Sequence, residues 1–172
     1  MKIRIAGTEF SLKYKSLEIY IQGCYRGCPG CHNPDSQPFC GGKEVELLPF
    51  LYEQADKVVQ FYDLIDTVYV TGGDLLCQSD NIGEDFTNAL VCTMPLINYF
   101  WLFTGCEEKY LPSWIWKYYD IVKCGNYQED NLNPEGSFPA SKNQKLLFNK
   151  RRRPLLQYKF DTTEFMGEKK WK

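Results

Sequence analysis

Apolar and polar positions alternate along short stretches that glycines and prolines separate. Residues 17–22 alternate in this way and include β-branched isoleucines, which predicts a strand. Similar short apolar runs predict further strands at 67–71, 100–103 and 120–123, and a last one at 144–148. Each of these runs except the last is followed closely by glycine, so the strands have defined ends.

Helical periodicity lies between the predicted strands. One apolar face recurs at i, i+3 and i+4 over residues 47–62, with Pro49 tolerated in the first turn; its members are Leu47, Leu48, Leu51, Ala55, Val58, Val59 and Tyr62. A second helix is predicted from Asp85 to about Ile97, and Pro95 ends or bends it. The aromatic stretch 110–118 is predicted to be helical or irregular.

Strands that alternate with helices predict an α/β fold with a parallel sheet built from βαβ units. Such sheets bind ligands beyond the carboxyl ends of their strands. At 172 residues the chain offers four or five βα units in one domain over residues 1–172. We therefore expect an incomplete parallel βα barrel whose open side could admit a macromolecule.

The carboxyl-terminal part of the chain is less regular. Residues 128–142 are rich in Asn, Glu, Pro, Gly and Ser and are predicted to form an exposed loop. The basic run Lys150–Arg153 opens a tail over about 150–172, which is expected to be loosely held beyond Phe160. Such a run is usually solvated, and a docking contact for a partner is the alternative.

The charge and composition of the chain argue against several classes of function. The net charge of −2 predicts neither nucleic-acid binding nor membrane attachment, and no apolar run approaches the roughly 18 residues of a membrane span. The first residues lack the apolar stretch of a signal peptide. Eight cysteines without such a leader indicate a reducing cytoplasm, where thiols stay free or bind metal.

Three of those thiols stand at a C-x3-C-x2-C spacing directly after the first predicted strand: Cys24, Cys28 and Cys31. Pro29 and Gly30 provide turn chemistry, so the loop can wind around a bulky inorganic group. A 4Fe-4S cubane that is held by only three cysteines leaves one iron without a protein ligand. That iron is free to bind a reacting molecule.

The cysteine loop has three alternative interpretations as a functional site. Cys28 and Cys31 alone could form a redox dithiol, or with His32 a c-type haem attachment site. A zinc site could use the three cysteines with His32 or a distant cysteine. The spacing favours iron–sulfur chemistry over all three. The remaining cysteines are scattered and are expected to be small buried hydrophobes: Cys40, Cys77, Cys92, Cys106 and Cys124.

The cysteine spacing resembles the signature of the radical S-adenosylmethionine enzymes. The longer string from Gly23 to Pro34 is similar to the small activating proteins of anaerobic ribonucleotide reductase. The resemblance extends in patches from about Ile19 to Gln144. It implies a partial βα barrel in which Cys24, Cys28 and Cys31 hold a 4Fe-4S cluster that binds S-adenosylmethionine.

The resemblance also implies roles for residues outside the cysteine loop. Gly72, Gly73 and Asp74 resemble the element that takes the methionine amino group, with Asp74 in the acidic position; a simple turn is the alternative. Thr104, followed by Gly105, is expected to contact the ribose or the methionyl part; an ordinary strand-ending turn is the alternative. Tyr25 or His32 would lie near the adenine; a solvent-exposed loop position is the alternative for each.

By the same resemblance the protein is expected to cleave S-adenosylmethionine reductively and to generate a glycyl radical on anaerobic ribonucleoside-triphosphate reductase. Flavodoxin or ferredoxin would be the reductant, and no membrane or nucleic acid is expected as a partner. The alternatives are activation of another glycyl radical enzyme, modification of a peptide, or a non-catalytic iron–sulfur or zinc-binding module.

Overall fold

The computed structural model describes residues 1–61, 63–79 and 81–152. Seven strands form one sheet in the order β3-β1-β2-β4-β5-β6-β7. The strands are β1 Lys2–Ser11, β2 Ser16–Ile21, β3 Lys43–Glu46, β4 Thr67–Gly72, β5 Tyr99–Phe103, β6 Ile121–Cys124 and β7 Lys145–Phe148. The helices are α1 Leu47–Gln60, α2 Ile82–Thr93 and α3 Ile115–Tyr118, and single 3-10 turns occupy Pro34–Ser36, Leu75–Cys77 and Glu108–Tyr110.

The centre of the sheet is parallel and its edges are antiparallel. Strands β2, β4, β5 and β6 pair in parallel, whereas β1 and β3 on one side and β7 on the other pair antiparallel. The sheet has two distinct edge strands and is therefore open. The predicted α/β fold with an incomplete parallel barrel is confirmed.

The five predicted strands are all present within one residue of their expected bounds, but β1 and β3 were not predicted. Strand β1 carries the buried Ile3 and Ile5, yet its register shifts between Ile5 and Gly7. That irregularity breaks the two-residue alternation that marks a strand. Strand β3 has four residues, which is too short for a periodic signal.

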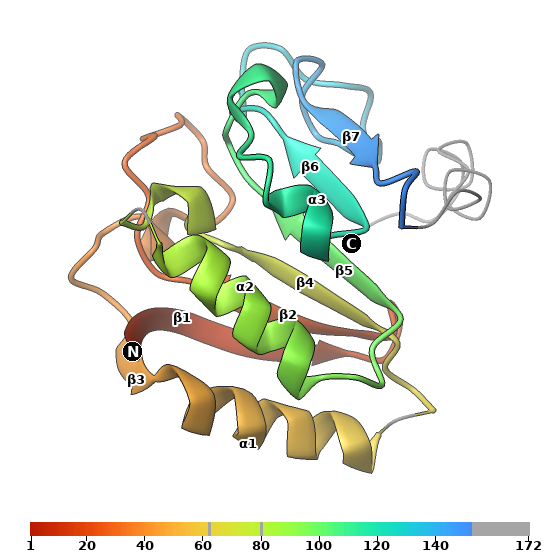
Figure 1. Ribbon diagram of the computed structural model, residues 1–172. Coiled ribbons are helices and arrows are strands. Elements are labelled where there is room, and N and C mark those ends of the chain that lie inside the picture. The colour runs from red at the N-terminus through yellow and green to blue at the C-terminus, as the bar shows by residue number, and fades with distance from the viewer. Residues whose placement is uncertain (62, 80, 153–172) are drawn as a thin grey trace.

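The helices cover one face of the sheet (Figure 1). Alternate strand residues such as Ile19, Val70 and Leu102 point to that face and join Leu51 of α1 and Phe86 of α2 in one buried cluster. Helix α1 keeps the predicted apolar face only in part, because Leu48 and Val59 are exposed. Tyr62, also expected on that face, lies outside the described residues.

The second helix begins at Ile82 and ends at Thr93, earlier at both ends than predicted. Pro95 explains why α2 ends at Thr93, because the residue before a proline is disfavoured in the helical region of φ and ψ. That residue, Met94, has φ −122° and ψ 59°, outside the helical region. In the aromatic stretch 110–118, only the short helix α3 is regular.

The opposite face of the sheet is partly aromatic and partly open. Tyr69 and Trp101 meet edge to face with ring centroids 5.2 Å apart, and Phe138 from the long loop packs on Phe103 at 5.7 Å. The loop 128–142, predicted simply to be exposed, therefore also folds over this face. Its apolar Phe138 is the physical reason.

The basic run is not purely a solvated feature. Arg152 makes an ion pair with the fully buried Asp120, with Nε 3.1 Å from Oδ1, and it donates to the carbonyl of Lys117. Arg152 therefore links the segment after β7 to the start of β6, although Lys150, Arg151 and Arg152 are all exposed, as expected for a solvated run. Arg153 and the rest of the tail lie outside the described residues.

No helix among the described residues is long and apolar enough to cross a membrane.

We predict that Leu51→Ala lowers the free energy of unfolding by about 2–5 kcal/mol, because Leu51 is fully buried beneath the sheet. Leu48→Ala on the same helix is the matched control and should cost no more than about 0.5 kcal/mol, since half of its side chain is exposed. Urea denaturation of the two variants measures both values. Equal losses would contradict the assignment of the helix face.

Candidate functional site

The loops that follow the parallel strands line one cavity of about 570 Å³. It lies at the carboxyl ends of β2, β4, β5 and β6, where a parallel sheet binds ligands. The expected site residues that line it are Cys24, Cys28, Cys31, His32, Gly72, Gly73, Asp74 and Thr104. Tyr25 is the exception, because it does not line the cavity.

The cysteine loop is anchored at its entrance and turns sharply within. The N–H of Gly23 donates to the carbonyl of Ser36 at 2.8 Å, and the N–H of Cys24 donates to the carbonyl of Gln37 at 2.8 Å. Gly27 and Gly30 have φ of 58° and 65°, a conformation that glycine adopts without strain. Cys24, Cys28 and Cys31 are free, half-buried thiols.

Gly72 and Gly73 allow the cysteine loop to approach the end of β4. Gly72 has φ 92°, and a Cβ on it would lie 2.8 Å from the backbone of Tyr20 in β2. A Cβ on Gly73 would lie 2.6 Å from the carbonyl oxygen of Gly23. Both contacts are with backbone atoms, so a larger residue would force β4 away from β2 at Gly72 and away from the start of the cysteine loop at Gly73.

The Asp74 carboxylate joins three loops beneath the cavity. Its Oδ1 accepts the N–H of Leu76 at 2.9 Å, and its Oδ2 accepts Nε of Arg26 at 2.6 Å and the N–H of Gly105 at 3.0 Å. The Thr104 hydroxyl lies 2.9 Å from both oxygens. Four donors match the roughly four lone-pair sites of a carboxylate. Asp74 is 1% exposed and is fully occupied.

Arg26 is a site residue that the motif comparison did not single out. Its side chain is 16% exposed, and it crosses from the cysteine loop to Asp74 and lies against Gly105. Burial alone would lower the pKa of Arg26, but the charge and hydrogen bond of Asp74 raise it above its usual value. The position of Arg26 between two cysteines was the available signal. It remains charged and ties the cysteine loop in place.

The two residues expected near an adenine are placed differently. His32 lies inside the cavity with its ring centroid 4.7 Å from that of Tyr127. The Tyr25 side chain is 68% exposed, with the Arg26 guanidinium 5.6 Å from its ring centroid. Of the two residues, only His32 offers an aromatic surface to a molecule in the cavity.

The Cys24 thiol is electronically distinct. A hydrogen bond from Cys77 is the largest cause that lowers the pKa of Cys24, to about 7, and the backbone N–H of Arg26 contributes in the same direction. The pKa of Cys77 is raised, mainly because its proton is shared with Cys24 and because it is buried. The Cys24 thiol is therefore readily deprotonated, as metal ligation requires.

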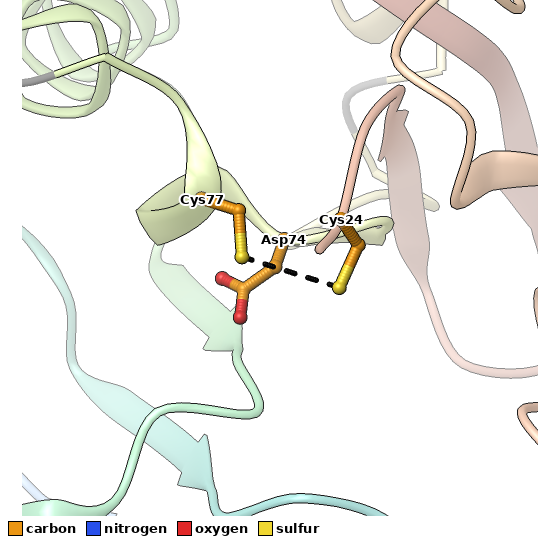
Figure 2. A group of neighbouring side chains, drawn as sticks. All are labelled: Cys24, Asp74 and Cys77. Atoms are coloured by element: carbon orange, nitrogen blue, oxygen red, sulfur yellow. Dashed lines mark hydrogen bonds between the residues drawn. The ribbon is translucent and has the colours of Figure 1, made fainter. Parts of the chain in front are cut away.

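The remaining cysteines differ from expectation in part. Cys77, Cys106 and Cys124 are buried as predicted, but Cys40 and Cys92 are exposed. Cys77 is not merely a buried hydrophobe either, since its Sγ lies 4.0 Å from that of Cys24 (Figure 2). No periodic signal could have found this contact, because 53 residues separate the two cysteines.

The other wall of the cavity comes from the open face of the sheet. Glu18 accepts the hydroxyl of Tyr20 at 2.7 Å, and Lys123 lies 5.8 Å from the ring centroid of Phe103. Burial lowers the pKa of Lys123. With Phe138 from the long loop, these side chains form a mixed polar and aromatic wall facing the cysteine loop.

The donor set suits an iron–sulfur cluster bound by three ligands. Three free thiols on one loop line a cavity whose remaining volume could hold a further ligand. Thiolates are the ligands that iron–sulfur clusters use.

Part of the chain is similar to proteins named as activating enzymes. Over 70 residues, the chain is 36% identical to the pyruvate formate-lyase-activating enzymes of Listeria monocytogenes and Listeria innocua. The match covers 40% of this chain and 28% of each relative, so the chain spans well under half of the length of these relatives. It shows distant homology to such enzymes.

A family model covers far more of the chain. The model described as a 4Fe-4S single cluster domain matches residues 15–147, from just before β2 to the last strand. Its span includes every strand of the parallel core and all the loops that line the cavity. The chain therefore belongs to the 4Fe-4S single cluster domain family.

Proposed function

We propose that the protein is a radical S-adenosylmethionine activase, in which Cys24, Cys28 and Cys31 hold the 4Fe-4S cluster. One observation carries this proposal: the three thiols share one cavity with Gly72, Gly73 and Thr104 at the carboxyl ends of the parallel strands. When bound, the cluster and S-adenosylmethionine together would supply one-electron reductive cleavage of the sulfonium, which gives methionine and a 5'-deoxyadenosyl radical. The distant homology to pyruvate formate-lyase-activating enzymes supports the same chemistry.

The protein's own residues would position the reactants. The half-buried thiols of Cys24, Cys28 and Cys31 would hold the cluster, while the glycines at the end of β4 allow backbone groups to approach a bound molecule. The aromatic ring of His32 is available to stack on a base. The open face of the sheet provides the entry for a partner's polypeptide.

In this proposal the main role of Asp74 is to hold the loops of the site together. An ammonium group could reach its carboxylate only by displacing one of the four donors that now occupy it. We propose that Asp74 holds the cysteine loop, the turn after β4 and the Thr104–Gly105 turn in one arrangement. A direct bond from Asp74 to a methionine amino group stays a prediction.

We propose a glycyl radical enzyme as the partner, and anaerobic ribonucleotide reductase as the specific one. The likeness of the cysteine loop from Gly23 to Pro34 to the activating proteins of that reductase supports the choice. Flavodoxin or ferredoxin in a reducing cytoplasm would supply the electron. Another glycyl radical enzyme is the competing partner, because the curated relatives are named for pyruvate formate-lyase.

The proposed activity predicts that anaerobically reconstituted protein binds about four irons per chain, as one cubane requires. With dithionite and S-adenosylmethionine it should release 5'-deoxyadenosine, which chromatography quantifies. Cys28→Ala should abolish release, because one cluster ligand is lost, whereas Cys92→Ala, on the exposed surface of α2, should leave it unchanged. Iron binding without any 5'-deoxyadenosine would indicate a non-catalytic cluster module instead.

The partner assignment predicts a glycyl radical signal in electron paramagnetic resonance when the active mixture is added to anaerobic ribonucleotide reductase. Pyruvate formate-lyase, added in its place, is the comparison. A signal on that enzyme alone would refute the reductase as partner and retain the activase chemistry.

The structural role of Asp74 predicts that Asp74→Asn lowers the free energy of unfolding of the cluster-free protein by about 3–5 kcal/mol. The reason is that the largely buried Arg26 guanidinium loses its counter-charge. Glu44→Gln, which removes the exposed partner of Lys2, should cost less than about 1 kcal/mol and serves as the control. Chemical denaturation without iron measures both. Wild-type stability in Asp74→Asn would show that Asp74 does not hold the loops together.

A further inference from the structure

Cys77 is held against a proposed cluster ligand by the turn that follows β4. Its thiol donates to Cys24 with the two sulfurs 4.0 Å apart, and Figure 2 shows the side chains directed toward each other from separate parts of the chain. Cys77 is 7% exposed, so its thiol is largely shielded from solvent. The spacing C-x3-C-x2-C gives no place to this fourth thiol.

Backbone hydrogen bonds fix this arrangement on both sides. The N–H of Asp74 donates to the carbonyl of Gly23 at 3.0 Å, and Nε2 of Gln78 donates to the same oxygen at 3.2 Å. The N–H of Cys77 donates to the carbonyl of Asp74 at 3.0 Å. The turn is thus tied to the residue that precedes Cys24, and the contact between the sulfurs does not depend on a flexible side chain alone.

Cys24, Asp74 and Cys77 bring their ligand atoms within 4.8 Å of one another, which raises the question of a separate metal site. The Asp74 carboxylate argues against it, because four donors, one of them the Arg26 guanidinium, already fill its lone pairs. Two thiols alone would leave an ion with too few protein ligands.

The geometry also argues against Cys77 as a fourth ligand of the cluster. Two thiolates on one tetrahedral ion lie roughly 3.8 Å apart when each metal–sulfur bond is about 2.3 Å. Thiolates of a cubane bind different irons and are therefore farther apart than that. At 4.0 Å from Cys24, Cys77 is placed as a hydrogen-bond donor to the ligand sulfur.

We propose that Cys77 donates its S–H to the Cys24 thiolate when the cluster is bound and thereby raises the reduction potential of the cluster. The inference rests on the proposed assignment of Cys24 as a cluster ligand. Reduction adds negative charge that spreads onto the cysteine sulfurs, and a donor to one of those sulfurs stabilises the reduced form.

The test is a redox titration of the reconstituted protein without S-adenosylmethionine, monitored by electron paramagnetic resonance of the reduced cluster. Cys77→Ala should shift the midpoint to a more negative potential. At the wild-type midpoint, the ratio of reduced to oxidised cluster should fall about threefold or more, as expected for the loss of one hydrogen bond. Cys77→Ser keeps a hydroxyl donor, so its midpoint potential should stay closer to that of the wild type. The control variant Cys92→Ala should have the wild-type midpoint potential.

An unchanged midpoint in Cys77→Ala would overturn the inference. Loss of the cluster from Cys77→Ala while its circular dichroism stays native would also overturn it, because Cys77 would then be a ligand. A shifted midpoint in a protein that never releases 5'-deoxyadenosine would support the inference and refute the proposed activity. A wild-type chain that takes up no iron would overturn the cluster assignment and this inference together.

Discussion

The buried ion pair between Arg26 and Asp74 is the interaction on which the site depends. The Nε–Oδ2 distance is 2.6 Å, and the carboxylate also accepts Thr104 and Gly105. A largely buried charge pair is stable only when hydrogen bonds satisfy both groups. That requirement specifies one relative placement of the cysteine loop and the loops after β4 and β5. The cavity exists because this placement is fixed.

Close backbone contact completes the arrangement. Gly73 lets the carbonyl of Gly23 approach the end of β4, and the Asp74 N–H bonds to that carbonyl. The two glycines of the second motif therefore have a packing role that is independent of any bound molecule. Sequence motifs of cofactor-binding families combine such packing constraints with ligand contacts. In this protein the backbone contacts of Gly72 and Gly73 account for the packing constraint without any ligand.

The sequence predicts the parallel core well because each strand carries a short apolar run that ends in glycine and is separated from the next by a helical period. The sequence does not predict β1, because the register shift between Ile5 and Gly7 interrupts the alternation of apolar and polar residues. The cysteine loop and Gly72–Asp74 could be found from local spacing. The contacts of Arg26 and Cys77 could not, since they depend on residues about 50 positions away in the chain.

The central claim is that three thiols hold a cluster with one iron open to S-adenosylmethionine. The most direct measurement compares the electron paramagnetic resonance spectrum of the reduced, reconstituted protein before and after S-adenosylmethionine is added. We predict a clear change in the g-values of the cluster, because S-adenosylmethionine would bind the open iron. An unchanged spectrum at saturating S-adenosylmethionine, in protein with a full complement of iron, would contradict it.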